Sequence, residues 1–170
     1  GRGGAFSPCG FTMCVREDDL SVVRDVLRDS GFIECDEGVL QAVRIEAGVP
    51  QYGPDITEDN LPQEVNRDAQ AINLNKGCYL GQETVARIDA LGHVNRLLVG
   101  VKFAGEEAPE VGTELFAGDA KVGSVTSSTF SPRLKTALAL AYVRAAQAQA
   151  GTQLTSDAGA AEVVELPLTT

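Results

Sequence analysis

The sequence has a single histidine and a single methionine, it lacks tryptophan, and it contains no long apolar run. One histidine, His93, is too few for a metal centre built on several histidines, and it leaves no choice of partners for a Ser/His/Asp triad. No apolar stretch approaches the roughly 20 residues that a membrane-spanning helix requires. With 44% hydrophobic and 22% charged residues, the composition is that of an ordinary soluble globular protein, and we expect no membrane partner.

Basic residues are scarce, since 14 Lys and Arg stand against 24 Asp and Glu, for a net charge of −10. This balance argues against binding to a nucleic-acid backbone. The charge is uneven, however. The range from Lys76 to Lys102 holds four cations and only two anions. A small anionic ligand suits such a stretch better than a nucleic acid does.

The four cysteines form no C-x-x-C pair, so local spacing does not support zinc or an iron–sulfur cluster, and we expect no metal site. They are Cys9, Cys14, Cys35 and Cys78. Cys9 and Cys14 could pair with each other or be buried. We expect all four to be free thiols, as in a reducing cytoplasm, and therefore a cytoplasmic location.

The first half of the chain has mostly helical patterns. Residues 11–15 (FTMCV) predict a short buried strand, and residues 16–32 predict an amphipathic helix that ends at a glycine. A second helix is predicted over residues 39–48, again with a terminal glycine. Residues 49–75 are polar and rich in turn residues, which predicts a long connection with little regular structure.

From Leu97 onward the pattern changes to short runs rich in valine, leucine and aromatic residues, separated by turn signals. The runs cover residues 97–103, 113–117, 121–130, 137–143 and 161–168. Residues 146–153 (AQAQAGTQ) predict a surface connection. Five or six strands at this spacing predict a small antiparallel barrel or sandwich. We therefore expect an α+β fold with two parts, residues 1–90 and a barrel over residues 91–170.

Residues 76–83 read KGCYLGQE and carry the most chemical information. The nearby ammonium of Lys76 favours a thiolate at Cys78, and glycines on both sides permit unusual backbone angles. The alternative is that Cys78 is a small packed hydrophobe. The remaining members of the motif are Gly77, Tyr79, Gly81, Gln82 and Glu83.

Two charged residues ahead of this motif have open roles. Arg44 either pairs on a helix surface with Glu37 or Glu46, or it clamps a carboxylate with its planar guanidinium. Asp55 follows a proline in a turn, where a carboxylate usually bonds to its own backbone, so we expect a structural role for it.

The motif KGCYLGQE, followed by VARI, closely resembles the signature of the YgfZ-type folate-binding proteins, relatives of the glycine cleavage T protein (aminomethyltransferase). The resemblance extends to RIEAGVPQYGPDI (44–56) and LPQEVN (61–66). It also covers GHVNRLLVGVKF (92–103) and the run from VGTELF to YVR (111–144), which resemble the C-terminal barrel common to both branches.

The resemblance implies a tetrahydrofolate site in a cavity between domains, next to a ferredoxin-like half-domain within residues 1–90. Arg44 would match the arginine that holds the glutamate tail of folate, with Arg96 as a second candidate for that anionic end. Cys78 would match the signature cysteine of a family that supports assembly or repair of iron–sulfur clusters. Iron–sulfur enzymes or their assembly proteins would then be partners.

The chain also departs from the T protein, which has an acidic pair where this sequence has Ser7, Pro8 and Cys9. We therefore expect a folate-binding accessory protein that is not itself catalytic. One alternative is a tetrahydrofolate-dependent aminomethyltransferase, and another is a structural fragment that binds no ligand alone. Because the chain opens on GRGGAFSPCGF without Met, we expect a piece of a longer protein whose earlier part supplies much of the folate pocket.

Overall fold

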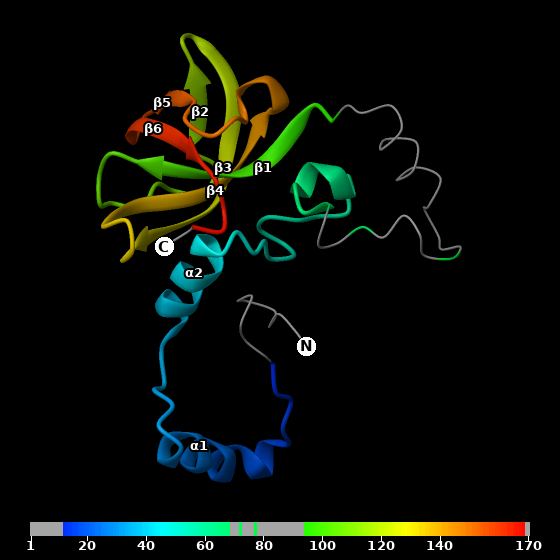
Figure 1. The fold of residues 1–170 in the computed structure, drawn as a ribbon, viewed down its shortest axis with the longest axis vertical. Coiled ribbons are helices and arrows are strands. Elements are labelled where there is room, and N and C mark those ends of the chain that lie inside the picture. Colours follow the sequence, from blue (N-terminus) through cyan, green and yellow to red (C-terminus); the bar gives the residue numbers. More distant parts are fainter. Residues whose placement is uncertain (1–11, 69–71, 73–76, 78–93, 169–170) are drawn as a thin grey trace.

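The structure is a computed structural model, and it describes residues 12–68, 72, 77 and 94–168. Within these residues, helices come first and a β-barrel follows (Figure 1). The helical elements are η1 (Glu17–Asp19), α1 (Leu20–Asp29), α2 (Glu37–Glu46), η2 (Pro62–Val65) and η3 (Ala145–Gln147). The strands are β1 (Arg96–Phe103), β2 (Glu114–Ala117), β3 (Ala120–Ser131), β4 (Thr136–Arg144), β5 (Gln153–Ser156) and β6 (Gly159–Val164).

The barrel is closed and antiparallel, with the strand order β1-β4-β3-β2-β5-β6 and a final pairing of β6 with β1. The predicted α+β fold with an antiparallel barrel is therefore confirmed. The sequence pattern missed β5, because that strand is four residues long and only its Leu154 is buried. The last predicted run was too long, since β6 ends at Val164 and residues 165–168 leave the sheet.

Strand β4 is buried on both faces, which explains its unbroken apolar run ALALAYV. Its alanines, such as Ala139 and Ala141, lie in the cluster that fills the barrel, where the space is narrow. Its larger side chains belong to a second cluster outside the barrel, which contains Leu138, Leu140 and Tyr142. The outer face of the barrel is thus a packing surface for another element.

Helix α2 covers that outer face (Figure 1). It begins where the Asp36 side chain accepts a hydrogen bond from the Val39 N–H at 2.9 Å, and it ends before Gly48, which has a φ of 64°. Ile45 is fully buried against the outer cluster of the barrel. The prediction of a helix that terminates at this glycine is confirmed.

The C-terminal strap, residues 165–168, contacts both α2 and the barrel. Leu166 fills a notch between Gly48 and Gly100, where a Cβ atom would lie 2.8 and 2.7 Å from Leu166 carbons. The Leu168 N–H donates to the Glu46 carbonyl at 2.9 Å. Because both notch positions are glycines, the strap can approach α2 and β1 closely.

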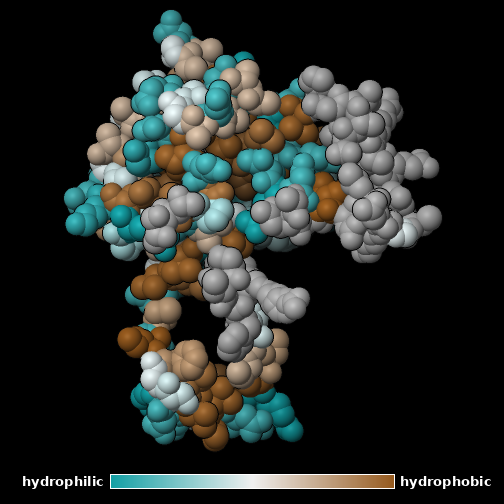
Figure 2. Space-filling model, in the orientation of Figure 1, coloured by the Kyte–Doolittle hydropathy of each residue, from teal (hydrophilic) through white to brown (hydrophobic). Residues whose placement is uncertain are grey.

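Helix α1 lies apart from the barrel and buries none of its residues (Figure 1). The predicted amphipathic helix is present, but its apolar stripe is not buried, since Val26 is 59% exposed and Val23 and Leu27 are only half-buried. Apolar surface is visible on this helix in Figure 2. The strand predicted over residues 11–15 is wrong for the part that the structure describes, since Thr12–Val15 is exposed and has no strand partner there.

Ahead of β1, the described residues contain one isolated bridge, between Tyr52 and Ile56, and no strand. The ferredoxin-like half-domain that the resemblance implies is therefore not seen in the described part. The predicted boundary between residues 90 and 91 lies outside the described residues and stays a prediction.

Candidate functional site

Most of the signature motif lies outside the described residues, including Cys78, Lys76, Tyr79, Gly81, Gln82 and Glu83. Gly77 is described and exposed. The predictions for these residues therefore stay predictions. Both predicted arginines, Arg44 and Arg96, are described, and each one pairs with a carboxylate.

Arg44 lies in a buried polar cluster between α2 and the barrel, and only 2% of its surface is exposed. Its Nη1 donates to Asp55 Oδ2 at 2.8 Å and to the Val49 carbonyl at 3.2 Å. Its Nη2 donates to Ser127 Oγ at 2.7 Å, and its Nε donates to Gln41 Oε1 at 2.6 Å. These internal acceptors satisfy the buried charge, as burial of a guanidinium requires.

The Asp55 carboxylate is equally well satisfied. Its Oδ2 also accepts the Gln51 N–H at 2.9 Å, and its Oδ1 accepts the hydroxyls of Thr126 and Ser127 at 2.5 and 2.7 Å. The pairing register of β3 shifts between Val125 and Ser127, so Thr126 is an extra residue in that strand. This β-bulge is what brings two consecutive hydroxyls to the same oxygen.

The cluster shows whether Arg44 pairs with a glutamate on its own helix. Its carboxylate partner is Asp55, eleven residues along the chain, and neither Glu37 nor Glu46 pairs with it. Asp55 bonds to the backbone of its own turn and has the structural role that we expected. A direct contact between Arg44 and folate stays a prediction, because in this structure its guanidinium faces internal acceptors.

Arg96 begins β1 and lies at the rim of the same region. Its Nε donates to Glu64 Oε1 and its Nη2 donates to Glu64 Oε2, each at 3.1 Å, so the contact is bidentate. The Arg96 side chain is 44% exposed and the Glu64 side chain 9%. The guanidinium also lies over the Tyr142 ring, 4.8 Å from its centre. The hydrogen bonds that Arg96 donates to Glu64 raise the pKa of Arg96 above its ordinary value.

Tyr142 connects the two arginine pairs. Its ring lies under Arg96, and its hydroxyl donates to the Asp55 carbonyl at 3.0 Å. Burial, reinforced by the negative charge of Glu64, raises the pKa of Tyr142 to about 12. The phenol is therefore neutral at ordinary pH and serves as a donor and an aromatic platform.

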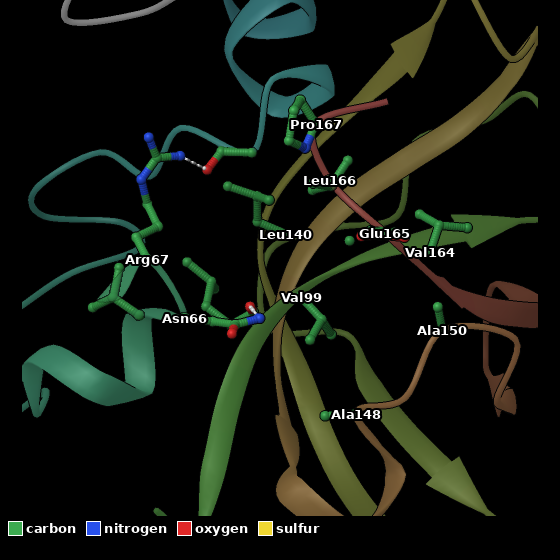
Figure 3. A pocket seen from close by; sticks show the side chains of 14 residues that line it. Asn66, Arg67, Val99, Leu140, Ala148, Ala150, Val164, Glu165, Leu166 and Pro167 are labelled. Carbon is green, nitrogen blue, oxygen red and sulfur yellow. Dashed lines mark hydrogen bonds between the residues drawn. The ribbon is translucent and has the colours of Figure 1, made fainter. Parts of the chain in front are cut away.

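A pocket of about 370 Å³ opens beside these residues, between η2, the barrel and the strap (Figure 3). Leu98 and Leu140 form part of its apolar lining, and Arg67 and Asn66 line it from the η2 side. Arg67 donates to the Gly48 carbonyl at 2.6 Å, and Asn66 donates to the Leu98 carbonyl at 3.3 Å. The lining thus combines apolar side chains with oriented polar groups, as small-molecule sites do.

Among the described residues, no group of three or more His, Cys, Asp or Glu side chains is placed to hold a metal ion. No described helix has the length and apolar content that crossing a membrane would need. Cys14 and Cys35 are free and exposed thiols. Cys9 and Cys78 lie outside the described residues.

The sequence patterns did not indicate four residues of this region: Glu64, Thr126, Ser127 and Tyr142. The bulge in β3 has no sequence signal of its own. All four residues do fall in segments that carry the family resemblance, Glu64 in residues 61–66 and the other three in residues 111–144, but the resemblance assigned them no role.

The barrel with a helix and a strap on its outer face is the architecture to which known proteins can be compared. Residues 96–169 match the glycine cleavage T-protein C-terminal barrel domain. An aminomethyltransferase from Symbiobacterium thermophilum is 33% identical over 175 residues, which span 98% of this chain and 46% of that protein. One from Halalkalibacterium halodurans is 29% identical over 90% of this chain and 42% of its own length.

The crystal structure of the glycine cleavage system aminomethyltransferase T from Bartonella henselae has the same fold, with a TM-score of 0.75 and 24% identity. It matches 87% of this chain and 43% of its own. The barrel therefore matches the T-protein C-terminal barrel domain, and the chain as a whole is similar to proteins named aminomethyltransferase. It spans less than half the length of the relatives that it matches.

Proposed function

We propose that the protein acts in aminomethyl transfer of the glycine cleavage type, with tetrahydrofolate as its cofactor. The observation that carries this proposal is the similarity to proteins named aminomethyltransferase along 98% of the chain, which includes α2 and η2 as well as the barrel. Since the chain corresponds to less than half of those relatives, the activity is proposed for the whole protein.

The described residues fit one part of a folate ligand. Folate combines flat rings with a carboxylate tail, and a pocket of about 370 Å³ is lined by Leu98, which lies two residues from Arg96 on the same face of β1. Arg96 is better placed for the anionic tail than Arg44, whose guanidinium is buried. In this proposal Arg96 contacts the tail, and Arg44 holds α2 in position. Tetrahydrofolate would supply the carrier for the one-carbon unit.

A second candidate is a YgfZ-type folate-binding protein of the cytoplasm that supports iron–sulfur enzymes. The observation in its favour is the motif KGCYLGQE, because classical T proteins lack the cysteine that stands here as Cys78. In this case the thiol at position 78, and not aminomethyl transfer, would carry the function.

The two candidates differ in what Cys78→Ala does. A transferase should release ammonia from an aminomethyl-lipoyl carrier protein in a tetrahydrofolate-dependent way, and Cys78→Ala should retain that activity. The accessory protein should bind reduced folate without releasing ammonia, and Cys78→Ala cells should lose iron–sulfur enzyme activity. Cys35→Ala, which removes an exposed thiol, is the matched control. Absence of both folate binding and activity would leave a structural module.

A further inference from the structure

The hydrogen-bonding edge of Arg96 that best suits a carboxylate is already occupied by Glu64. Nε and Nη2 form the edge of a guanidinium that can donate to both oxygens of one carboxylate at once. Both hydrogen bonds to Glu64 measure 3.1 Å. A carboxylate on a ligand would seek the same geometry. Glu64 therefore stands where the anionic end of a ligand would bind.

Glu64 is held in place from behind. Its Oε2 accepts the Leu61 N–H at 3.3 Å at the start of η2, and its side chain is 9% exposed. Arg96 is much more open, at 44%. Of the two partners, the guanidinium is therefore the one that solvent and ligands can reach.

The ring of Tyr142 covers one flat side of the guanidinium, at 4.8 Å, and Glu64 covers one edge. The Nη1 end then points away from Glu64. Arg96 and Leu98 share the outer face of β1, because alternate residues of a strand point the same way, and Leu98 lines the pocket. A ligand in the pocket could thus extend a carboxylate toward Arg96.

The charge of Arg96 is balanced before any ligand arrives. Glu64 neutralises it at contact distance, and Asp59 adds negative potential from farther away. Because the Arg96 side chain is 44% exposed, water competes with Glu64 for its N–H groups, and this competition weakens the pair. The pair is weak enough for a ligand carboxylate to displace Glu64, but the displacement reduces the affinity of that ligand.

We propose that Glu64 is an internal competitor for the carboxylate that Arg96 receives from a ligand, and that it thereby limits the affinity for that anionic end. The inference rests on the proposed function, in which the carboxylate belongs to the glutamate tail of a folate. Glu64 is a positioning residue: it orients the guanidinium of Arg96, but it also occupies the N–H groups that a ligand carboxylate would use.

The test uses γ-glutamylglutamate, a fragment of the tail without the pterin, and isothermal titration of the whole protein. Glu64→Gln keeps the shape of the side chain and removes its charge, and it should tighten binding about fivefold, the equivalent of roughly 1 kcal/mol. The gain should shrink at high salt, where charges near the surface are screened. It should vanish in the double variant Glu64→Gln with Arg96→Gln.

Glu162→Gln is the matched control, since it removes a carboxylate from another half-exposed pair, with Lys102 at 3.2 Å, and changes the net charge equally. It should leave the affinity unchanged. A second readout needs no Glu64 variant: the Arg96 Nε–H signal in NMR spectra of the unaltered protein should shift in a saturable way with the probe.

Equal or weaker binding by Glu64→Gln, or a probe that binds neither protein and leaves the Nε–H signal unmoved, would overturn the inference. Neither result bears on aminomethyl transfer, which the ammonia-release assay decides separately. Conversely, an inactive protein that shows the fivefold gain would retain the internal competitor and lose the proposed function.

Discussion

The molecule contains two arginine–carboxylate pairs that share a neighbour, Tyr142, and differ in almost everything else. In the pair of Arg44 with Asp55, the side chains are 2% and 0% exposed, and hydroxyl, amide and carbonyl groups complete the hydrogen bonds. In the pair of Arg96 with Glu64, the side chains are 44% and 9% exposed. The same two functional groups are therefore buried in one pair and partly exposed to water in the other.

The difference in burial indicates which pair stabilises the fold and which pair can exchange its carboxylate for another anion. A buried ion pair is not replaceable by water, so losing one member leaves a charge without compensation. In a pair at the protein surface, water and ligands compete with the partner side chain for its hydrogen-bonding groups. We therefore assign the buried pair to the attachment of α2 and the rim pair to recognition.

The largest expected effect comes from Asp55→Asn. The variant leaves the buried guanidinium of Arg44 without its counter-charge, and the free energy of unfolding should fall by about 3–5 kcal/mol. Urea denaturation measures this loss. Asp59→Asn, an exposed change in the same connection, should stay within about 0.5 kcal/mol. Similar losses in both variants would remove the distinction between buried and exposed carboxylates.

Ser127→Ala should come next, with a loss of about 1–3 kcal/mol, because it removes a hydroxyl that donates to Asp55 and accepts from Arg44. Ser124→Ala, on the same strand but outside the cluster, should change stability by less than about 0.5 kcal/mol. If the two serine variants unfold at the same urea concentration, the hydroxyl at the bulge does not support the buried pair.

Tyr142 gives a prediction that appears only at high pH. Its pKa is about 12 in the folded protein and 10.0 ordinarily, so the unfolded chain releases this proton first. The stability that depends on the neutral phenol is complete below pH 10.0 and is lost as the pH rises toward about 12. Glu64, Asp55 and Arg96 are the charges that face it.

Tyr142→Phe should flatten this fall in stability, as followed by urea denaturation across the alkaline range. Tyr52→Phe, at a position that is 71% exposed, should leave the fall unchanged. An alkaline fall of the same steepness in Tyr142→Phe would show that another group causes it.

The smallest effect on stability is expected from Glu64→Gln, below about 1 kcal/mol, since the Arg96 side chain is 44% exposed and the amide keeps an oxygen for the Leu61 N–H. Thermal denaturation in low salt measures it. A loss as large as that of Asp55→Asn would mean that the rim pair is a structural element after all.

Local patterns predicted the elements because their causes are local. The run ALALAYV specified β4, and Gly48 marked the end of α2 through its positive φ. β5 was missed because four residues with one buried side chain carry too weak a pattern.

The site could be predicted only in part, because its contacts join distant residues. Arg44 was a candidate, yet its hydroxyl partner Ser127 lies 83 residues away and reaches it through a bulge that has no sequence signature. Glu64 meets Arg96 across 32 residues. Such pairings follow from the closure of the barrel and the docking of η2, which composition and periodicity do not specify.

Double-mutant cycles, measured by urea denaturation at about 0.1 M and about 1 M salt, separate the two arginine–carboxylate pairs. We expect a coupling between Arg44 and Asp55 of about 3 kcal/mol or more that salt does not change. We expect a coupling between Arg96 and Glu64 below about 1 kcal/mol that decreases in high salt. Equal couplings with equal salt dependence would mean that the two pairs do not differ in kind.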